Sequence, residues 1–126
     1  CPDSREKYKL KQSDIDDIAK YADIDRMTQH LYENKIVEKS KKFSDLDFYK
    51  PKPSQKCPDG YSGRVGIYEV LQVTESIKGL ITSHTTTDEL HERARKEGMI
   101  SMAEDGIIKA AQGITSIEEV LRVTRE

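Results

Sequence analysis

Two cysteines are the side chains of this chain best suited to chemistry. Cys1 and Cys57 each have a serine where the second thiol of a C-x-x-C pair would stand, Ser4 after the first and Ser54 before the second. Two C-x-x-C pairs at the ends of a small insertion are typical of a zinc knob. The sequence therefore indicates a degenerate, zinc-knob-like site in which Cys1 and Cys57 are the remnant ligands.

Serine is a poor replacement for a zinc thiolate, because its hydroxyl does not ionise near neutral pH. We therefore predict that the site does not bind zinc. The alternative is that Cys1 and Cys57 are unrelated free thiols; a disulfide between them is conceivable, but a reducing cytoplasm disfavours it. His30 lies inside the insertion and is the histidine that could replace a lost ligand, whereas His84 and His91 are expected to be surface or capping residues.

Composition excludes several classes of protein. The chain has 126 residues, of which 35% are hydrophobic and 35% charged, and its net charge is -2. No stretch approaches the roughly 18 apolar residues of a membrane-spanning helix, and two cysteines cannot staple a secreted scaffold of this length. A nucleic-acid partner bound through bulk positive charge is also not expected. Because the chain begins with Cys1 and shows no signal-peptide pattern, we expect a cytoplasmic protein cut from a longer one.

The second half of the chain shows clear helical periodicity. A β-branched and aromatic run at 65–71 predicts a strand. Four helices are expected after it: one near 75–83, and three that begin at Thr86, at Ser101 and at Thr115 or Ser116, each with a glutamate that completes a capping box. We expect these helices to form one compact bundle, in which Gly106 permits a close approach of two helices.

The first half predicts two short helices, over about 14–22 and from Asp23 or Asp25 to about 38, followed by a charged loop at 39–46. The run at 47–50, DFYK, is one candidate partner for the strand at 65–71, and a strand that precedes Cys1 is the other. The expected fold is mostly α, with residues 1–62 as a small knob-like helical insertion and residues 63–126 as a strand plus helical C-terminal domain. Because the insertion has little apolar surface, it needs a metal or a neighbouring surface to be stable.

The insertion also carries a basic run. Its simplest interpretation is a solvated face balanced by nearby acids, and the functional alternative is contact with acidic phospholipids. The lysines concerned are Lys35, Lys39, Lys41, Lys42, Lys50, Lys52 and Lys56.

Long ordered stretches of this sequence resemble one family. They are CPDSREKY at 1–8, CPDGYSGRVGIYEVL at 57–71, VTESIKGLI at 73–81 and the end of the chain, with Gly98, Glu104-Asp105-Gly106, Lys109 and GITSIEEVLRVT at 113–124. Together they closely resemble the C-terminal part of the type II secretion and type IV pilus-assembly ATPases. Residues 9–53 match only in position.

The resemblance implies a parent that is a cytoplasmic, homo-hexameric P-loop ATPase on the inner face of the plasma membrane. Such a parent uses ATP and magnesium, and it works with an inner-membrane platform protein. This sequence contains no G-x-x-x-x-G-K-[ST] phosphate loop, so the catalytic core is expected before Cys1, and this piece has no catalytic or cofactor-binding residue of its own. The alternative hypothesis is a stand-alone helical adaptor that binds a protein partner.

Overall fold

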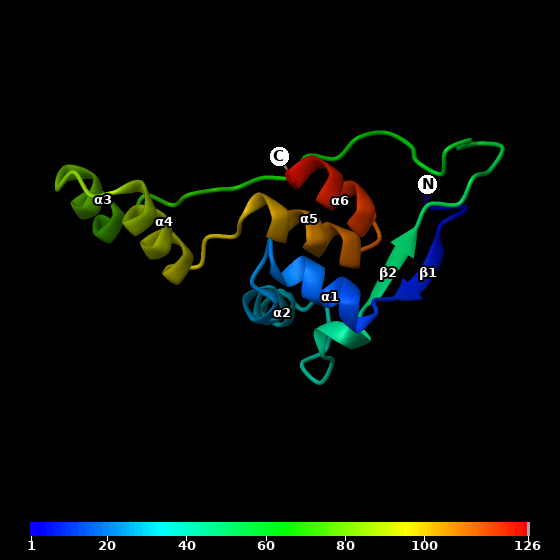
Figure 1. The fold of residues 1–126 in the computed structure, drawn as a ribbon, viewed down its shortest axis with the longest axis horizontal. Helices are drawn as coiled ribbons and strands as arrows, with labels where there is room; N and C mark the ends of the chain where they lie inside the picture. The colour runs from blue at the N-terminus through cyan, green and yellow to red at the C-terminus, as the bar shows by residue number, and fades with distance from the viewer. Residues whose placement is uncertain (126) are drawn as a thin grey trace.

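The computed structural model describes residues 1–125 and is mostly α-helical, as expected. In chain order the elements are β1 (Glu6–Lys9), α1 (Gln12–Ala19), α2 (Ile24–Glu33), the short 3-10 helix η1 (Phe43–Asp45), β2 (Asp47–Lys50), α3 (Glu75–Thr82), α4 (Thr87–Lys96), α5 (Met102–Ala111) and α6 (Ile117–Thr124). In Figure 1 they form a body at one end and an arm, α3 with α4, that projects from it.

The helices begin where the capping residues predict. The Thr86 and Ser101 side chains accept the backbone N–H groups of Glu89 and Glu104, and each glutamate closes a reciprocal capping box. Ser116 caps α6 by accepting the N–H of Glu119. Since these bonds join residues only three apart, local sequence is enough to set these helix starts.

The strand pairing differs from the expected one. β1 and β2 form an antiparallel hairpin in which Glu6 faces Lys50 and Lys9 faces Asp47. The run at 47–50 is therefore a strand, but its partner is residues 6–9 and not 65–71. The predicted strand at 65–71 is wrong for the described chain, because that run finds no partner strand among residues 1–125 and forms no ladder.

One hydrophobic core holds the body together, and it draws on both halves of the sequence. Met27 and Leu31 of α2 contribute to it, as do Phe48 of β2 and Ile107 of α5. Its buried members are Leu10, Ile18, Met27, Leu31, Phe43, Leu46, Phe48, Ile107, Ile108, Ala110, Ile117 and Val120. The neighbouring surface that the insertion needs is thus supplied by α5 and α6.

The expected compact bundle of four C-terminal helices is wrong in its packing. Helix α5 packs on α6, on β2 and on α2, whereas α3 packs on α4. None of the core residues described above lies in α3 or α4. Apolar residues of α5 pack against apolar residues of the insertion. Helices α5 and α6 therefore belong to the body, whereas α3 and α4 form the separate arm (Figure 1).

Gly106 lies at a close approach of α5 to α6, as the sequence predicts. A Cβ atom added at Gly106 would lie 2.6 Å from Cγ1 of Val120, and both residues are buried. A larger residue therefore has no room unless α6 shifts.

A buried carboxylate joins the starts of two helices. The Glu104 side chain is 1% exposed. It accepts the backbone N–H of Ser101, at 3.1 Å, and that of Asp23, at 3.3 Å. The beginning of α5 is thereby tied to the beginning of α2. No helix within residues 1–125 is both long and apolar enough to cross a bilayer.

Candidate functional site

The four positions of the knob-like site, Cys1, Ser4, Ser54 and Cys57, form a clasp where the insertion begins and ends. Cys1 and Cys57 are joined by a disulfide, with their Cα atoms 6.4 Å apart. The amino group of Cys1 also donates a hydrogen bond to the carbonyl oxygen of Gly60, at 2.8 Å. The structure thus brings the two predicted cysteines together and closes the insertion with a covalent bond.

The two serines lie at the clasp without forming a metal site. The Ser54 hydroxyl accepts the N–H of Cys57, at 3.1 Å, while the Ser4 hydroxyl is buried and has no hydrogen-bond partner among the described residues. Zinc needs four donors, and its sulfur donors must be thiolates. A disulfide with two hydroxyls does not fit that requirement. Within residues 1–125 no group of three or more His, Cys, Asp or Glu side chains is placed to hold a metal.

The three histidines lie on helices or at a helix end. His30 is on α2, where its ring lies 3.3 Å from the side-chain amide of Asn34. His84 follows α3 in a left-handed backbone conformation, and the His91 ring on α4 lies 3.8 Å from the carboxylate of Glu69. His30 and His91 therefore have local contacts on their helices, and these positions agree with the prediction that His84 and His91 are surface or capping residues.

The chain leaves the clasp through a contact with α6. The hydroxyls of Tyr61 and Ser116 lie 2.7 Å apart and are hydrogen-bonded. Burial raises the pKa of the Tyr61 phenol, and the hydrogen bond to Ser116 opposes that rise. This contact joins the exit of the insertion to the N-terminus of the last helix.

Beyond Tyr61 the chain runs as a stretched, largely exposed connection to the arm (Figure 1). We call residues 64–73 the extended segment. Most of its apolar side chains are exposed to solvent, with Val70 73% and Tyr68 65% exposed, while Ile67 is half-buried. Val65, Leu71 and Val73 are also exposed. A run of β-forming residues with unpaired backbone is a surface ready to pair with another strand.

Two side chains of α5 hold the extended segment near its start. Asp105 accepts the backbone N–H of Tyr68, at 2.9 Å, and Lys109 donates to the carbonyl oxygen of Gly66, at 2.6 Å. Asp105 and Lys109 were singled out in the sequence only as part of the family-like tail. Their spacing of four residues, on a predicted helix, is the signal that they lie on one face.

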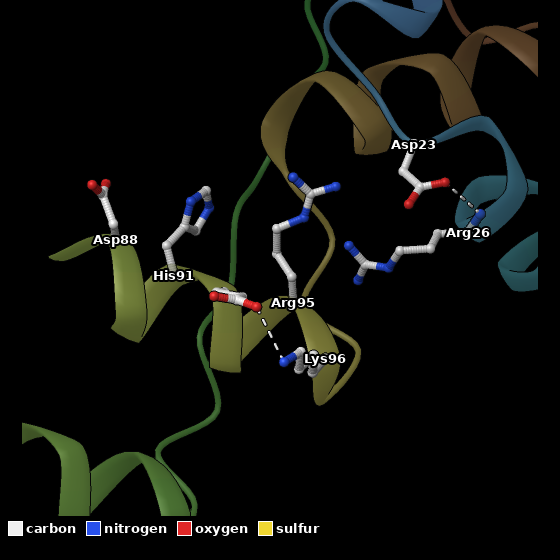
Figure 2. A pocket seen from close by; sticks show the side chains of 7 residues that line it. Asp23, Arg26, Asp88, His91, Arg95 and Lys96 are labelled. Carbon is white, nitrogen blue, oxygen red and sulfur yellow. Dashed lines mark hydrogen bonds and ion pairs between the residues drawn. The ribbon is translucent and has the colours of Figure 1, made fainter. Parts of the chain in front are cut away.

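A separate cleft of about 540 Å³ lies between the start of α2 and the helix α4 of the arm. Figure 2 shows Arg26 and Arg95 reaching into the space between the two helices from opposite sides. Arg26 donates to the carbonyl oxygen of Met99, at 2.6 Å. Asp23, Asp88 and Glu92 line the cleft as well, so its charges are mixed, and the contacts that are present link the arm to the body.

Comparison with known proteins identifies similar sequences. The family model described as "Type II/IV secretion system protein" matches residues 6–122. The type IV pilus assembly ATPase PilB of Pseudomonas aeruginosa is 44% identical over 85 residues, which cover 68% of this chain and 15% of that protein. The type II secretion system ATPase E of Vibrio cholerae is 34% identical over 127 residues, which cover 100% of this chain and 21% of that protein.

A third relative, the type II secretion system protein E of Xanthomonas campestris pv. campestris, is 39% identical over 82 residues. That alignment covers 65% of this chain and 14% of the relative. The chain thus spans a small part of the length of each of these relatives.

Proposed function

Because the chain belongs to the type II/IV secretion system protein family, we propose that it is the C-terminal part of a hexameric ATPase that powers type IV pilus assembly or type II protein secretion. ATP and magnesium act in the parent protein and have no site in this part. The role of this part is to pack subunits together and to transmit motion.

The observation that carries this role is the extended segment. It has a strand-forming sequence and exposed apolar side chains, and most of its backbone groups have no partner among residues 1–125. Leaving such a segment in water is unfavourable, and pairing it in a sheet satisfies its backbone. A strand from another part of the longer protein is the partner that fits it.

The position of Cys1 indicates where that strand comes from. Cys1, Gly63, Val65 and Ile67 line one cleft of about 460 Å³ next to α6. A segment that precedes Cys1 in the longer parent would therefore enter beside the start of the extended segment. Pairing between those residues and the extended segment would connect the ATP-binding core directly to the arm and the body.

The arm is suited to contact a neighbouring subunit. Ile77 fills the interface between α3 and α4 and is fully buried, whereas Ile81 on the same helix is 49% exposed. Other subunits of a homo-hexamer and an inner-membrane platform protein are the proposed partners. Acidic phospholipids are a further proposed contact through the lysines of the insertion. The proposed location of the parent is the cytoplasm, at the inner face of the plasma membrane.

We retain residues 1–62 as a knob-like insertion and residues 63–126 as the C-terminal domain of this parent. The disulfide and the two serines support a clasp that closes without metal.

The proposal is tested by a charge placed on the extended segment. Val70→Asp should leave the folding of the 126-residue chain unchanged, because Val70 is exposed there. In the full-length ATPase, the same substitution should weaken hexamer formation and ATP turnover, since an aspartate would have to enter a sheet. Hexamer content by light scattering and magnesium-dependent ATP hydrolysis are the two measurements.

Met102→Asp is the matched control. Met102 is also an exposed apolar residue, 43% accessible, but it lies at the first position of α5, where aspartate is favourable. It should change neither measurement. If Val70→Asp in the full-length protein behaves like this control, the extended segment does not dock in the ATPase and the proposed role is wrong.

A further inference from the structure

The hydrogen bonds from α5 to the extended segment reach alternate residues. Tyr68 donates its N–H to Oδ2 of Asp105, and Gly66 accepts a hydrogen bond from Nζ of Lys109 through its carbonyl oxygen. An acceptor and a donor on a helix therefore satisfy the two kinds of backbone group that a neighbouring strand would satisfy.

Asp105 and Lys109 are also bonded to each other. Their charged atoms lie 2.7 Å apart, and the two side chains are only 24% and 18% exposed. The ammonium of Lys109 lies 4.9 Å from the centre of the Tyr68 ring. Three contacts thus fix the lysine in place, and its partial burial shields the pair from screening by salt.

The spacing of the bonded residues defines one edge of the segment. In an extended chain, the N–H and C=O groups of a residue point to one edge, and those of the next residue point to the other. Gly66 and Tyr68 share an edge, which α5 occupies. The backbone groups of Val65, Ile67 and Glu69 point to the opposite edge and have no hydrogen bond within residues 1–125.

We propose that Asp105 and Lys109 form an edge cap, which closes one side of the extended segment to other strands and leaves only the side of Val65, Ile67 and Glu69 open for pairing. The inference rests on the proposed function, in which the pairing strand belongs to the longer ATPase. The edge cap makes the segment the last strand of the sheet that it joins. It also couples any displacement of that strand to α5.

Hydrogen exchange in the 126-residue chain tests the edge cap. Asp105→Leu should speed exchange of the Tyr68 amide by about tenfold, the effect expected from losing one hydrogen bond to a charged acceptor. Lys109→Met should shift the carbonyl carbon resonance of Gly66, and Lys109→Arg, which keeps a donor, should largely restore it.

Lys96→Met is the matched control, because Lys96 forms an i,i+4 ion pair with Glu92 on α4 that has no bond to the extended segment. It should leave the exchange of the Tyr68 amide unchanged. If Asp105→Leu also leaves that exchange unchanged while α5 remains folded by its own protected amides, there is no edge cap.

The full-length ATPase separates this inference from the proposed function. There the amides of Ile67 and Glu69 should become protected by the incoming strand, while protection of the Tyr68 amide should still depend on Asp105. A Tyr68 amide that stays protected in the Asp105→Leu protein would mean that a second strand covers that edge, and the edge cap would be refuted. Unprotected Ile67 and Glu69 amides would instead count against the proposed function.

Discussion

Replacing Gly106 by alanine sets two known effects against each other. Alanine in a helix interior is favoured over glycine by about 1 kcal/mol. Here, however, the new Cβ atom would lie 2.6 Å from Cγ1 and 3.0 Å from Cγ2 of Val120. Val120 is 2% exposed, so it has little freedom to move away, and overpacking of a core typically costs about 1–3 kcal/mol.

We therefore expect Gly106→Ala to be neutral or to destabilise the chain by up to about 2 kcal/mol, and Gly106→Leu to destabilise it more. Urea unfolding followed by circular dichroism at 222 nm measures the free energy of unfolding. The matched control is Gly79→Ala in α3, where an added Cβ has open space around it. That change should stabilise its helix by about 1 kcal/mol.

A double-mutant cycle isolates the contact. Val120→Ala alone leaves a cavity and should destabilise the chain, but it also removes the methyl groups that an alanine at position 106 would meet. In the double variant, Gly106→Ala should therefore become stabilising, with a coupling of about 0.5–3 kcal/mol between the two sites. If Gly106→Ala is already as favourable as Gly79→Ala, or if the two changes are additive, the close packing of α5 on α6 is wrong.

Reduction of the disulfide should cost about 4 kcal/mol of stability, the chain-entropy value for a loop of this length, and should lower the urea midpoint; an unchanged midpoint in reductant would contradict the clasp. Ser4→Cys with Ser54→Cys should create tight zinc binding under reducing conditions, measured as bound metal, whereas one equivalent of zinc in the unaltered chain would show that the serines suffice. The chain alone should neither bind nor hydrolyse ATP, and saturable magnesium-dependent turnover would overturn the assignment of catalysis to the rest of the parent. Hydrogen bonds from Arg122 lower the pKa of the Glu119 carboxyl in the folded chain. The pair therefore stabilises the fold at pH values above the ordinary glutamate pKa of about 4.3, and this stabilisation is lost as the pH falls through the lowered pKa of Glu119. Arg122→Leu should raise the pKa of Glu119 in an NMR titration.

Local signals in the sequence predict local structure well. Ser101 with Glu104 and Thr86 with Glu89 define helix starts, because each capping box closes within one turn. The role of Gly106 was also predictable, since a helix-interior glycine is costly unless another helix needs the space. These predictions depend on residues close in sequence or on one residue's missing side chain.

Packing between distant segments was much less predictable. The run at 65–71 has the composition of a strand, but a strand requires a partner, and local sequence cannot tell whether one lies nearby. In the same way, the periodicity of α5 showed an apolar face without showing that α2 of the insertion, with Met27 and Leu31, packs on this helix. The edge cap of Asp105 and Lys109 was missed because its other members are backbone groups, which leave no mark in the residue types.

The link between Cys1 and Cys57 was considered from the sequence and disfavoured on the chemistry of the compartment. The structure brings the two residues together because both ends of the insertion return to the same place, beside Gly60. Spacing alone could suggest this meeting point, but it could not choose between a metal and a covalent bond.

Two connecting segments attach the arm to the body: the extended segment before α3, and residues 97–101 after α4 (Figure 1). A unit joined to the rest of a protein by one chain segment can rotate about that segment. A unit joined by two segments resists such rotation, because turning it would wind the two segments around each other. Two connections therefore restrict rotation of the arm about its own axis more than a single connection would. Both connections are also tied to the body before they reach the arm, the extended segment at Gly66 and Tyr68 by α5 and the second connection at Met99 by Arg26.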